Sequence, residues 1–222
     1  MPAKNSLKEY RENTFYHIYN RGVAKGDIFK NKSDYKKFLS YLKLYLSLPT
    51  DLQGVSLKVS PSRQLKNHAE SIDLHSYCLM PNHFHLLIFQ KEETAINYFM
   101  RSLATKYSLY FNRKYKRVGP LFQGTYKAVI VESEEQFVYL SKYIHRNPVA
   151  ATSERLLEGE KLENYKYSSY ENYLGLFKQS WVKTSEVLSY FSKTNPINSY
   201  KNFIEEVDES DVLRIKELVL DI

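Results

Sequence analysis

The sequence predicts an α/β fold of the α+β type, in which helices cover an antiparallel central sheet and a C-terminal extension follows. Short runs rich in β-branched and aromatic residues alternate with two long segments of helical periodicity. The order is strand, helix, strand, strand, helix, strand. The 222 residues are 43% hydrophobic and 26% charged, a composition that favours a packed core and excludes wholesale disorder.

Three strands and one helix are predicted in the first part of the chain. Residues 14–20 are β-branched or aromatic and run into an Asn-Arg-Gly turn, which indicates a strand. Residues 33–48 place apolar side chains at helical spacing until Pro49. A loop insertion rich in polar residues follows. Residues 71–79 and 83–90 are strand-like runs on either side of a short turn, so we expect an antiparallel hairpin.

The second part of the core adds two helices and a strand. Residues 94–115 form a long amphipathic pattern with apolar side chains on one face. A Gly-Pro turn leads to a predicted strand over 127–132. A helix over 134–146 follows, with two glutamates in its first turn, and Pro148 is expected to end it. The first six elements match the split βαβ plan of ferredoxin-like sheets, with one helix appended.

The charge of the chain is divided unevenly. Residues 204–222 contain seven acids and two bases, a net charge of −5. Residues 1–203 therefore hold 32 − 2 = 30 bases and 25 − 7 = 18 acids, a net charge of +12. The chain also contains 20 Tyr and 12 Phe. A basic, aromatic body suggests a polyanionic partner, bound through phosphates and stacked bases. We place the domain boundary after residue 152, with short helices and the acidic tail in 153–222.

Other features of the sequence favour a cytoplasmic protein. No apolar run approaches the roughly 20 residues that a membrane helix needs, so no membrane partner is expected. The first 13 residues are polar and of mixed charge, unlike a secretory signal. The one cysteine, Cys78, cannot form an internal disulfide and is expected to be a buried small residue.

Four residues form a candidate site for chemistry. His83 and His85 alternate on a predicted strand, so both imidazoles point to one face and could bind one cation. Tyr143 and Asn147 are four residues apart on a predicted helix and share a face. If that face covers the histidines, Asn147 supplies an oxygen ligand and the phenol of Tyr143 lies beside the metal, a layout that suits phosphoryl transfer.

Simpler interpretations of the same residues remain open at this point. The two histidines could be ordinary side chains at the edge of a sheet, and Tyr143 could be one packing residue among many tyrosines. Tyr139, one helical turn earlier, is the rival nucleophile, although it lies farther from Asn147. His17 and His75 are expected to pack or to face DNA.

Five ordered segments raise the weight of the catalytic interpretation. They are FYHIYNRG, LMPNHFHLLI, YFNRKYKRVGPLFQGTYKAV, YIHRNPVA and YSSYENYLG. Together they resemble the HUH single-strand tyrosine transposases of bacterial insertion sequences, most closely the branch of the REP-associated tyrosine transposases. The resemblance covers about residues 14–175. It implies a ferredoxin-like sandwich and a catalytic domain over 1–152.

The resemblance also implies the roles of the site. His83 and His85 bind a divalent metal, Mg²⁺ or Mn²⁺, Asn147 completes the metal site, and Tyr143 attacks DNA. The protein would cleave and rejoin single-stranded or hairpin DNA through a 5′-phosphotyrosine, as a cytoplasmic, nucleoid-associated transposase, and a homodimer is an expected assembly. The predicted DNA-binding residues are Arg113, Lys114, Lys116, Arg117 and Lys127.

Two positions depart from the family pattern. The family often has arginine where this chain has Thr125 and Ala150, which puts the phosphate contacts and the substrate specificity in doubt. A domesticated, non-catalytic protein that binds hairpin DNA is the first alternative. A nicking relaxase or replication initiator is the second, but such proteins share mainly the histidine pair with this chain.

Overall fold

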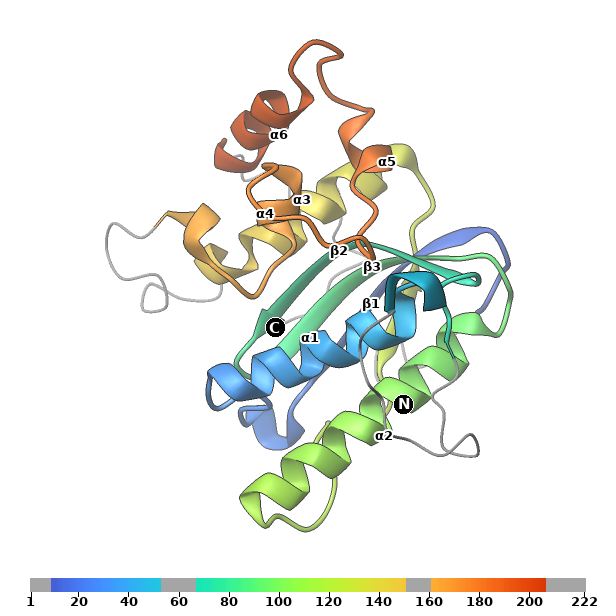
Figure 1. Ribbon diagram of the computed structural model, residues 1–222, viewed down its shortest axis with the longest axis vertical. Helices are drawn as coiled ribbons and strands as arrows, with labels where there is room; N and C mark the ends of the chain where they lie inside the picture. The colour runs from blue at the N-terminus through green and yellow to red at the C-terminus, as the bar shows by residue number, and fades with distance from the viewer. Residues whose placement is uncertain (1–8, 53–66, 151–160, 207–222) are drawn as a thin grey trace.

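The computed structural model describes residues 9–52, 67–150 and 161–206 (Figure 1). The predicted domain boundary after residue 152, most of the predicted loop insertion and most of the acidic tail lie outside these residues. Within the described part of the chain, no helix is long and apolar enough to cross a membrane.

Four strands form one antiparallel sheet in the order β2-β3-β1-β4. Their bounds are β1 (Thr14–Arg21), β2 (Ile72–Met80), β3 (His83–Gln90) and β4 (Lys127–Ile130). Strands β1 and β2, which a helix connects in the chain, are separated in the sheet by β3. Strands β3 and β4, which a second helix connects, are separated by β1. This is the split βαβ arrangement. The predicted fold class is confirmed.

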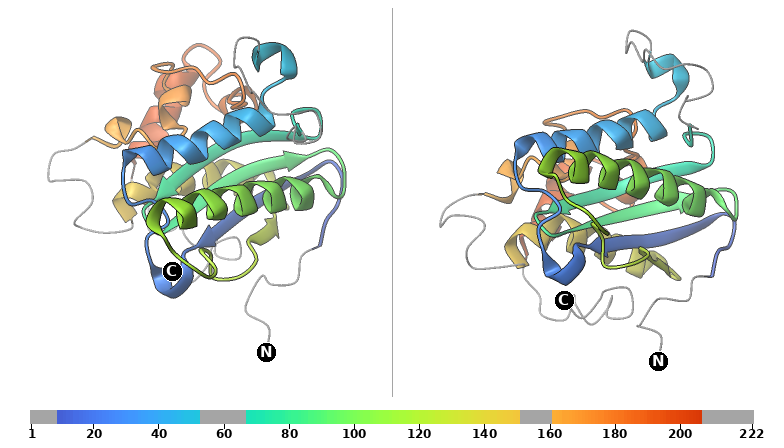
Figure 2. Two further views of the ribbon diagram at one scale, coloured as in Figure 1. Left: turned by 60° about the horizontal axis from the view of Figure 1, so that its bottom comes forward. Right: turned by 90° about the horizontal axis from the view of Figure 1, so that it is seen from below.

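Two long helices cover one face of this sheet. Figure 2 shows α1 (Lys32–Leu46) and α2 (Ala95–Tyr115) side by side on that face. Helix α1 begins at Asn31, whose side chain accepts from the Ser33 amide while Asp34 accepts from the Asn31 amide, a capping box. Alternate residues of β1 and β3, such as Ile18 and Leu86, pack under these helices in the larger core.

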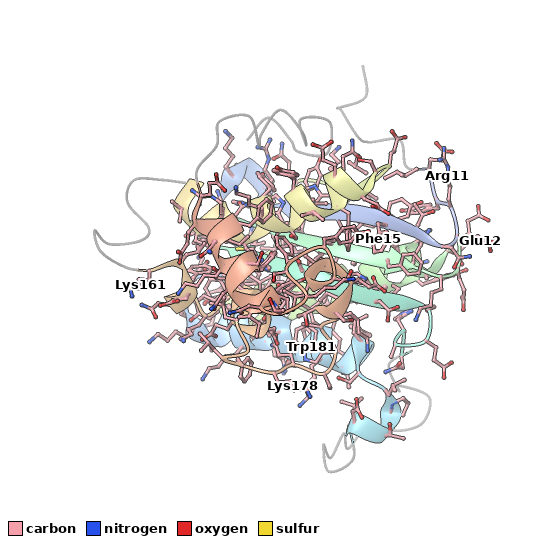
Figure 3. The ribbon with its side chains drawn as sticks, turned by 90° about the horizontal axis from the view of Figure 1, so that it is seen from above. Arg11, Glu12, Phe15, Lys161, Lys178 and Trp181 are labelled. Atoms are coloured by element: carbon pink, nitrogen blue, oxygen red, sulfur yellow. The ribbon has the colours of Figure 1, made fainter. Side chains whose placement is uncertain are left out.

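The opposite face is covered by α3 (Glu134–Ala150) and the C-terminal extension (Figure 3). Phe15 of β1 packs against Phe137 of α3, with ring centroids 4.4 Å apart. The extension contains η4 (Leu162–Asn164), α4 (Tyr170–Tyr173), α5 (Ser185–Leu188) and α6 (Pro196–Glu205). It also pairs with the outer edge of β2 through bridges at Cys78–Ser168 and Leu74–Val182, so that edge is not open to other strands.

A buried hydrogen-bond network joins α3 to the extension. His145 is fully buried, with Nδ1 2.7 Å from the Tyr200 hydroxyl of α6 and Nε2 2.8 Å from the Ser169 hydroxyl. The Tyr200 hydroxyl also donates to Ser141 on α3 at 3.1 Å. Every ring nitrogen of His145 therefore has a partner, and this network fixes how α3 is rotated against the extension.

One expectation about helices was wrong, and one of the short helices expected in the extension was not located. Pro148 does not end α3, which continues to Ala150. A proline removes the bond to the carbonyl four residues earlier and crowds that carbonyl, but here it stands only two residues before the end of the helix, so little of the helix depends on that bond. Helix α6 was not predicted, although Asn195 caps it and Pro196 stands in its first turn, a common start signal.

The carboxylate of Asp34 is the main buried charge of the α1–α2 layer. It is fully buried and accepts from Lys114 Nζ at 2.6 Å, from the Tyr115 hydroxyl at 2.7 Å and from the Lys30 amide at 2.9 Å. Burial alone would raise the pKa of Asp34, but these hydrogen bonds outweigh it, and the net pKa is lowered.

We expect Asp34→Ala to lower the free energy of unfolding by about 3 kcal/mol, the low end for a broken buried pair, because Lys114 can still reach water. Urea denaturation near neutral pH measures this loss. Because the folded pKa is depressed, the stabilisation is present above the unfolded pKa and is lost as the pH falls through the folded value. The difference between the two proteins should therefore shrink in acid. A difference in unfolding free energy that stays constant in acid would contradict the role of the ionised Asp34 carboxylate.

Candidate active site

His83 and His85 lie at the start of β3 and face α3. Alternation along the strand gives them one face, and Phe84 between them enters the opposite core. Their ring centroids are 5.0 Å apart and the ring planes are nearly perpendicular, at 85°. Across the sheet, His83 pairs with Arg21 and His85 pairs with Tyr19. The predicted sharing of one face by the two imidazoles is confirmed.

Helix α3 brings the other two predicted residues to the same place. The Asn147 side-chain oxygen lies 3.1 Å from Nε2 of His83. The Tyr143 ring lies 5.4 Å from the His85 ring, centroid to centroid. The rival Tyr139 instead packs edge-on against Phe203 of α6, at 5.2 Å. All four predicted residues thus meet within one chain, while their chemical roles stay predictions.

Two buried polar atoms at this place lack a hydrogen-bond partner among the described residues. They are Nε2 of His85 and the hydroxyl oxygen of Tyr143. The other ring nitrogen of His85, Nδ1, lies 2.9 Å from Nε2 of His17. An unpartnered imidazole nitrogen beside a second imidazole and an amide oxygen fits a divalent cation. No group of three His, Cys, Asp or Glu in the described chain could hold a metal, so a metal here depends on Asn147.

Burial sets the protonation of this site. It lowers the pKa of His85 well below its usual 6.5, and the neighbouring His83 and His17 lower it further. His85 is therefore neutral near pH 7 and has a lone pair to offer. Burial also raises the pKa of Tyr143 to about 12, so the phenol is protonated in the free protein.

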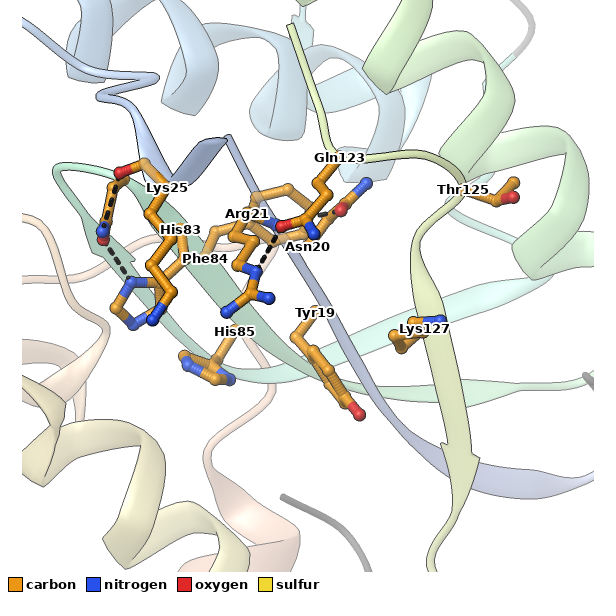
Figure 4. A pocket seen from close by; sticks show the side chains of 11 residues that line it. Tyr19, Asn20, Arg21, Lys25, His83, Phe84, His85, Gln123, Thr125 and Lys127 are labelled. Carbon is orange, nitrogen blue, oxygen red and sulfur yellow. Dashed lines mark hydrogen bonds between the residues drawn. The ribbon is translucent and has the colours of Figure 1, made fainter. Parts of the chain in front are cut away.

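A pocket opens beside the histidines, between the end of β1 and the loop that leads into β4 (Figure 4). Its volume is about 170 Å³, and its lining contains three cationic side chains and no carboxylate. The cations are Arg21, Lys25 and Lys127. Of these three, only Lys127 was predicted from the sequence to bind DNA. Arg21 is two residues after Tyr19 on β1, so strand alternation puts both side chains on the same face of the sheet. That spacing is the sequence signal that could have identified Arg21.

The other four predicted DNA-binding residues lie elsewhere. Arg113, Lys114, Lys116 and Arg117 are at the C-terminal end of α2, and none of them lines the pocket. Lys114 is bound to Asp34, and Arg117 donates to Asn112 at 3.2 Å. Thr125, where the family often has arginine, does line the pocket. Cys78 is buried, as expected.

Comparisons with known proteins find a matching family model and similar solved structures. Residues 59–147 match the family model described as "Transposase IS200 like". The search of curated proteins found no match. A solved structure titled "Structure of the REP associates tyrosine transposase bound to a REP hairpin" is similar over 80% of this chain and 95% of that chain, at 9% identity and a TM-score of 0.48. The family match agrees with the resemblance over residues 59–147, which contain the second and third of the five sequence segments and most of the fourth.

Proposed function

We propose that this protein is a DNA strand transferase that cleaves and rejoins single-stranded DNA through a 5′-phosphotyrosine intermediate. The proposal starts from the similarity of residues 59–147 to the IS200-like transposases. The observation that carries the proposal is the meeting of Tyr143 and Asn147 of α3 with His83 and His85 of β3. The site lies within a single chain, so one protomer holds every proposed residue, and a homodimer is not required to complete it.

The chemistry of the proposal is a phosphodiester exchange. The Tyr143 phenol oxygen attacks phosphorus, a new P–O bond forms to tyrosine, and the bond to the 3′ oxygen breaks. The phenol loses its proton and the departing 3′ oxygen gains one. Attack by another 3′-OH on the phosphotyrosine reverses the step and joins new ends. Because the protein–DNA bond retains the phosphodiester, no nucleotide triphosphate is needed.

His83, His85 and Asn147 would hold the divalent metal, with Mg²⁺ and Mn²⁺ as the candidates. Two imidazoles with an amide oxygen suit Mn²⁺ better than Mg²⁺, whereas Mg²⁺ is the more available ion. When bound, such an ion polarises a phosphate oxygen and holds the phosphate for in-line attack. The proposed substrates are single strands and hairpins, whose exposed backbone an attacking tyrosine can reach.

A covalent adduct on a denaturing gel tests the function. The probes are single-stranded oligonucleotides from the DNA that flanks this gene, incubated with Mn²⁺. Because tyrosine keeps the 5′ phosphate, a label at the 3′ end should move with the protein and a label at the 5′ end should not. Absence of any adduct, with binding intact, favours the non-catalytic hairpin-binding alternative. Equal cleavage of blunt duplex and single strand would count against a transposase.

The raised pKa of Tyr143 predicts how cleavage depends on pH. Below about 12 the phenolate fraction grows with pH, so single-turnover cleavage should accelerate between roughly pH 7 and 9. Rapid-quench assays at constant salt would measure this. Circular dichroism at each pH controls for the fold. A rate that falls over this range would contradict a protonated phenol as the resting nucleophile.

His17 is expected to orient His85 for metal binding. If Nε2 of His85 offers its lone pair, Nδ1 carries the proton and donates to Nε2 of His17, 2.9 Å away. His17→Leu removes that acceptor, so Mn²⁺ affinity should fall about tenfold. His17→Gln keeps an acceptor and should retain most of the affinity. Titration followed by electron paramagnetic resonance measures both, and equal affinity in His17→Leu and the parent would refute the role.

A further inference from the structure

Arg21 is the last residue of β1 and lies directly across the sheet from His83. It shares strand parity with Tyr19, which pairs with His85, so its side chain leaves the sheet on the face of the two histidines. Figure 4 shows its guanidinium turned toward the same space as the His83 and His85 rings. Arg21 thus presents a permanent positive charge next to the proposed metal ligands.

Gln123 holds this guanidinium from one side. Its side-chain oxygen accepts from Nε of Arg21 at 2.6 Å, and its backbone amide donates to the Arg21 carbonyl at 2.9 Å. With Nε occupied, the two terminal nitrogens are the groups left to face the pocket. Among the described residues no carboxylate pairs with Arg21, and the pocket lining contains none.

We propose that Arg21 is a further DNA-binding residue, whose guanidinium holds a phosphate of the single strand beside His83 and His85, and that Gln123 positions it. This inference rests on the proposed function and adds a residue to it. Two parallel N–H donors match two phosphate oxygens, the geometry that makes arginine suited to phosphate recognition. The phosphate would complete an ion pair that the described part of the chain leaves open.

The test measures binding of a single-stranded, fluorescent oligothymidylate by anisotropy, over a series of salt concentrations. All proteins carry Tyr143→Phe, so that no covalent adduct contributes. Arg21→Gln should weaken binding about tenfold at low salt, as expected for a lost charged hydrogen bond. It should also lower the slope of log affinity against log salt by about 0.7, the value for one phosphate on a single strand.

Three matched variants make the result specific. Arg101→Gln makes the same charge change on the exposed surface of α2, on the other side of the sheet, and should leave the slope unchanged. Arg21→Lys keeps the positive charge but loses the paired N–H donors of the guanidinium. It should therefore keep the salt dependence of binding and lose part of the affinity. Gln123→Ala should weaken binding without changing the slope, and should add nothing in an Arg21→Gln background.

The outcomes separate the two levels of inference. If the parent binds the oligothymidylate but Arg21→Gln matches Arg101→Gln, the Arg21 proposal is overturned and the strand transferase stands. If Gln123→Ala weakens the Arg21→Gln protein further, its role as a positioning residue is overturned. A parent protein that binds no single strand would overturn the proposed function, and this inference with it.

Discussion

Tyr143→Phe should abolish the covalent protein–DNA adduct while folding and DNA binding survive. The substitution keeps the ring that packs against His85 and removes only the hydroxyl, the proposed nucleophile. That hydroxyl is buried without a partner among the described residues, so its removal should not lower stability. Denaturing gels measure the adduct, and thermal unfolding checks the fold.

Tyr139→Phe is the matched control for this result. Tyr139 lies on the same helix, one turn earlier, and packs against Phe203. Tyr139→Phe also removes one hydroxyl oxygen, but away from the histidine pair. The covalent adduct should therefore form at the same rate in this variant as in the parent protein. An adduct that persists in Tyr143→Phe and disappears in Tyr139→Phe would reverse the assignment of the nucleophile.

Replacing either histidine of the pair should have the second large effect. His83→Ala and His85→Ala should each abolish cleavage and weaken Mn²⁺ binding, because each removes one of the three proposed metal ligands. Asn147→Ala should give a milder loss, since water can replace a neutral amide oxygen. Mn²⁺ binding is measured in the absence of DNA, so the result does not depend on turnover.

A histidine outside the site controls for the loss of a buried imidazole. His68 is buried between Tyr45 and Phe99, in the core on the other face of the sheet. His68→Ala should keep Mn²⁺ affinity even if it lowers stability. Full cleavage by the parent protein in excess chelator would rule out the metal role altogether.

Local periodicity explains what could be predicted from the sequence. A period of two puts His83 and His85 on one face, and a separation of four puts Tyr143 and Asn147 on one side of a helix. Each of these predictions needs only neighbouring residues. Their meeting across the molecule followed from the family resemblance, and the structure agrees with it.

Contacts between distant parts of the chain explain what could not be predicted. Lys114 looks like a phosphate ligand in a basic helix end, but its ammonium reaches Asp34, 80 residues earlier. Arg21 looks like a turn residue until the register of β1 and β3 places it opposite His83. At Pro148 the local signal is misleading in the opposite sense: a proline predicts a helix end, but α3 continues for two more residues.

The His145 network has a consequence for how this protein could be altered. His145 is two residues from Tyr143, so it points about 200° around the helix from the phenol. Its partners, Tyr200 and Ser169, belong to the extension, whereas the histidine pair belongs to the sheet. Tyr143 and Asn147 both lie on α3, so a change in the extension that turns this helix would move the proposed nucleophile and one proposed metal ligand together, relative to the two histidines of the sheet. Substitutions in the extension, far along the chain from the histidine pair, could therefore alter cleavage rate and metal affinity at the same time.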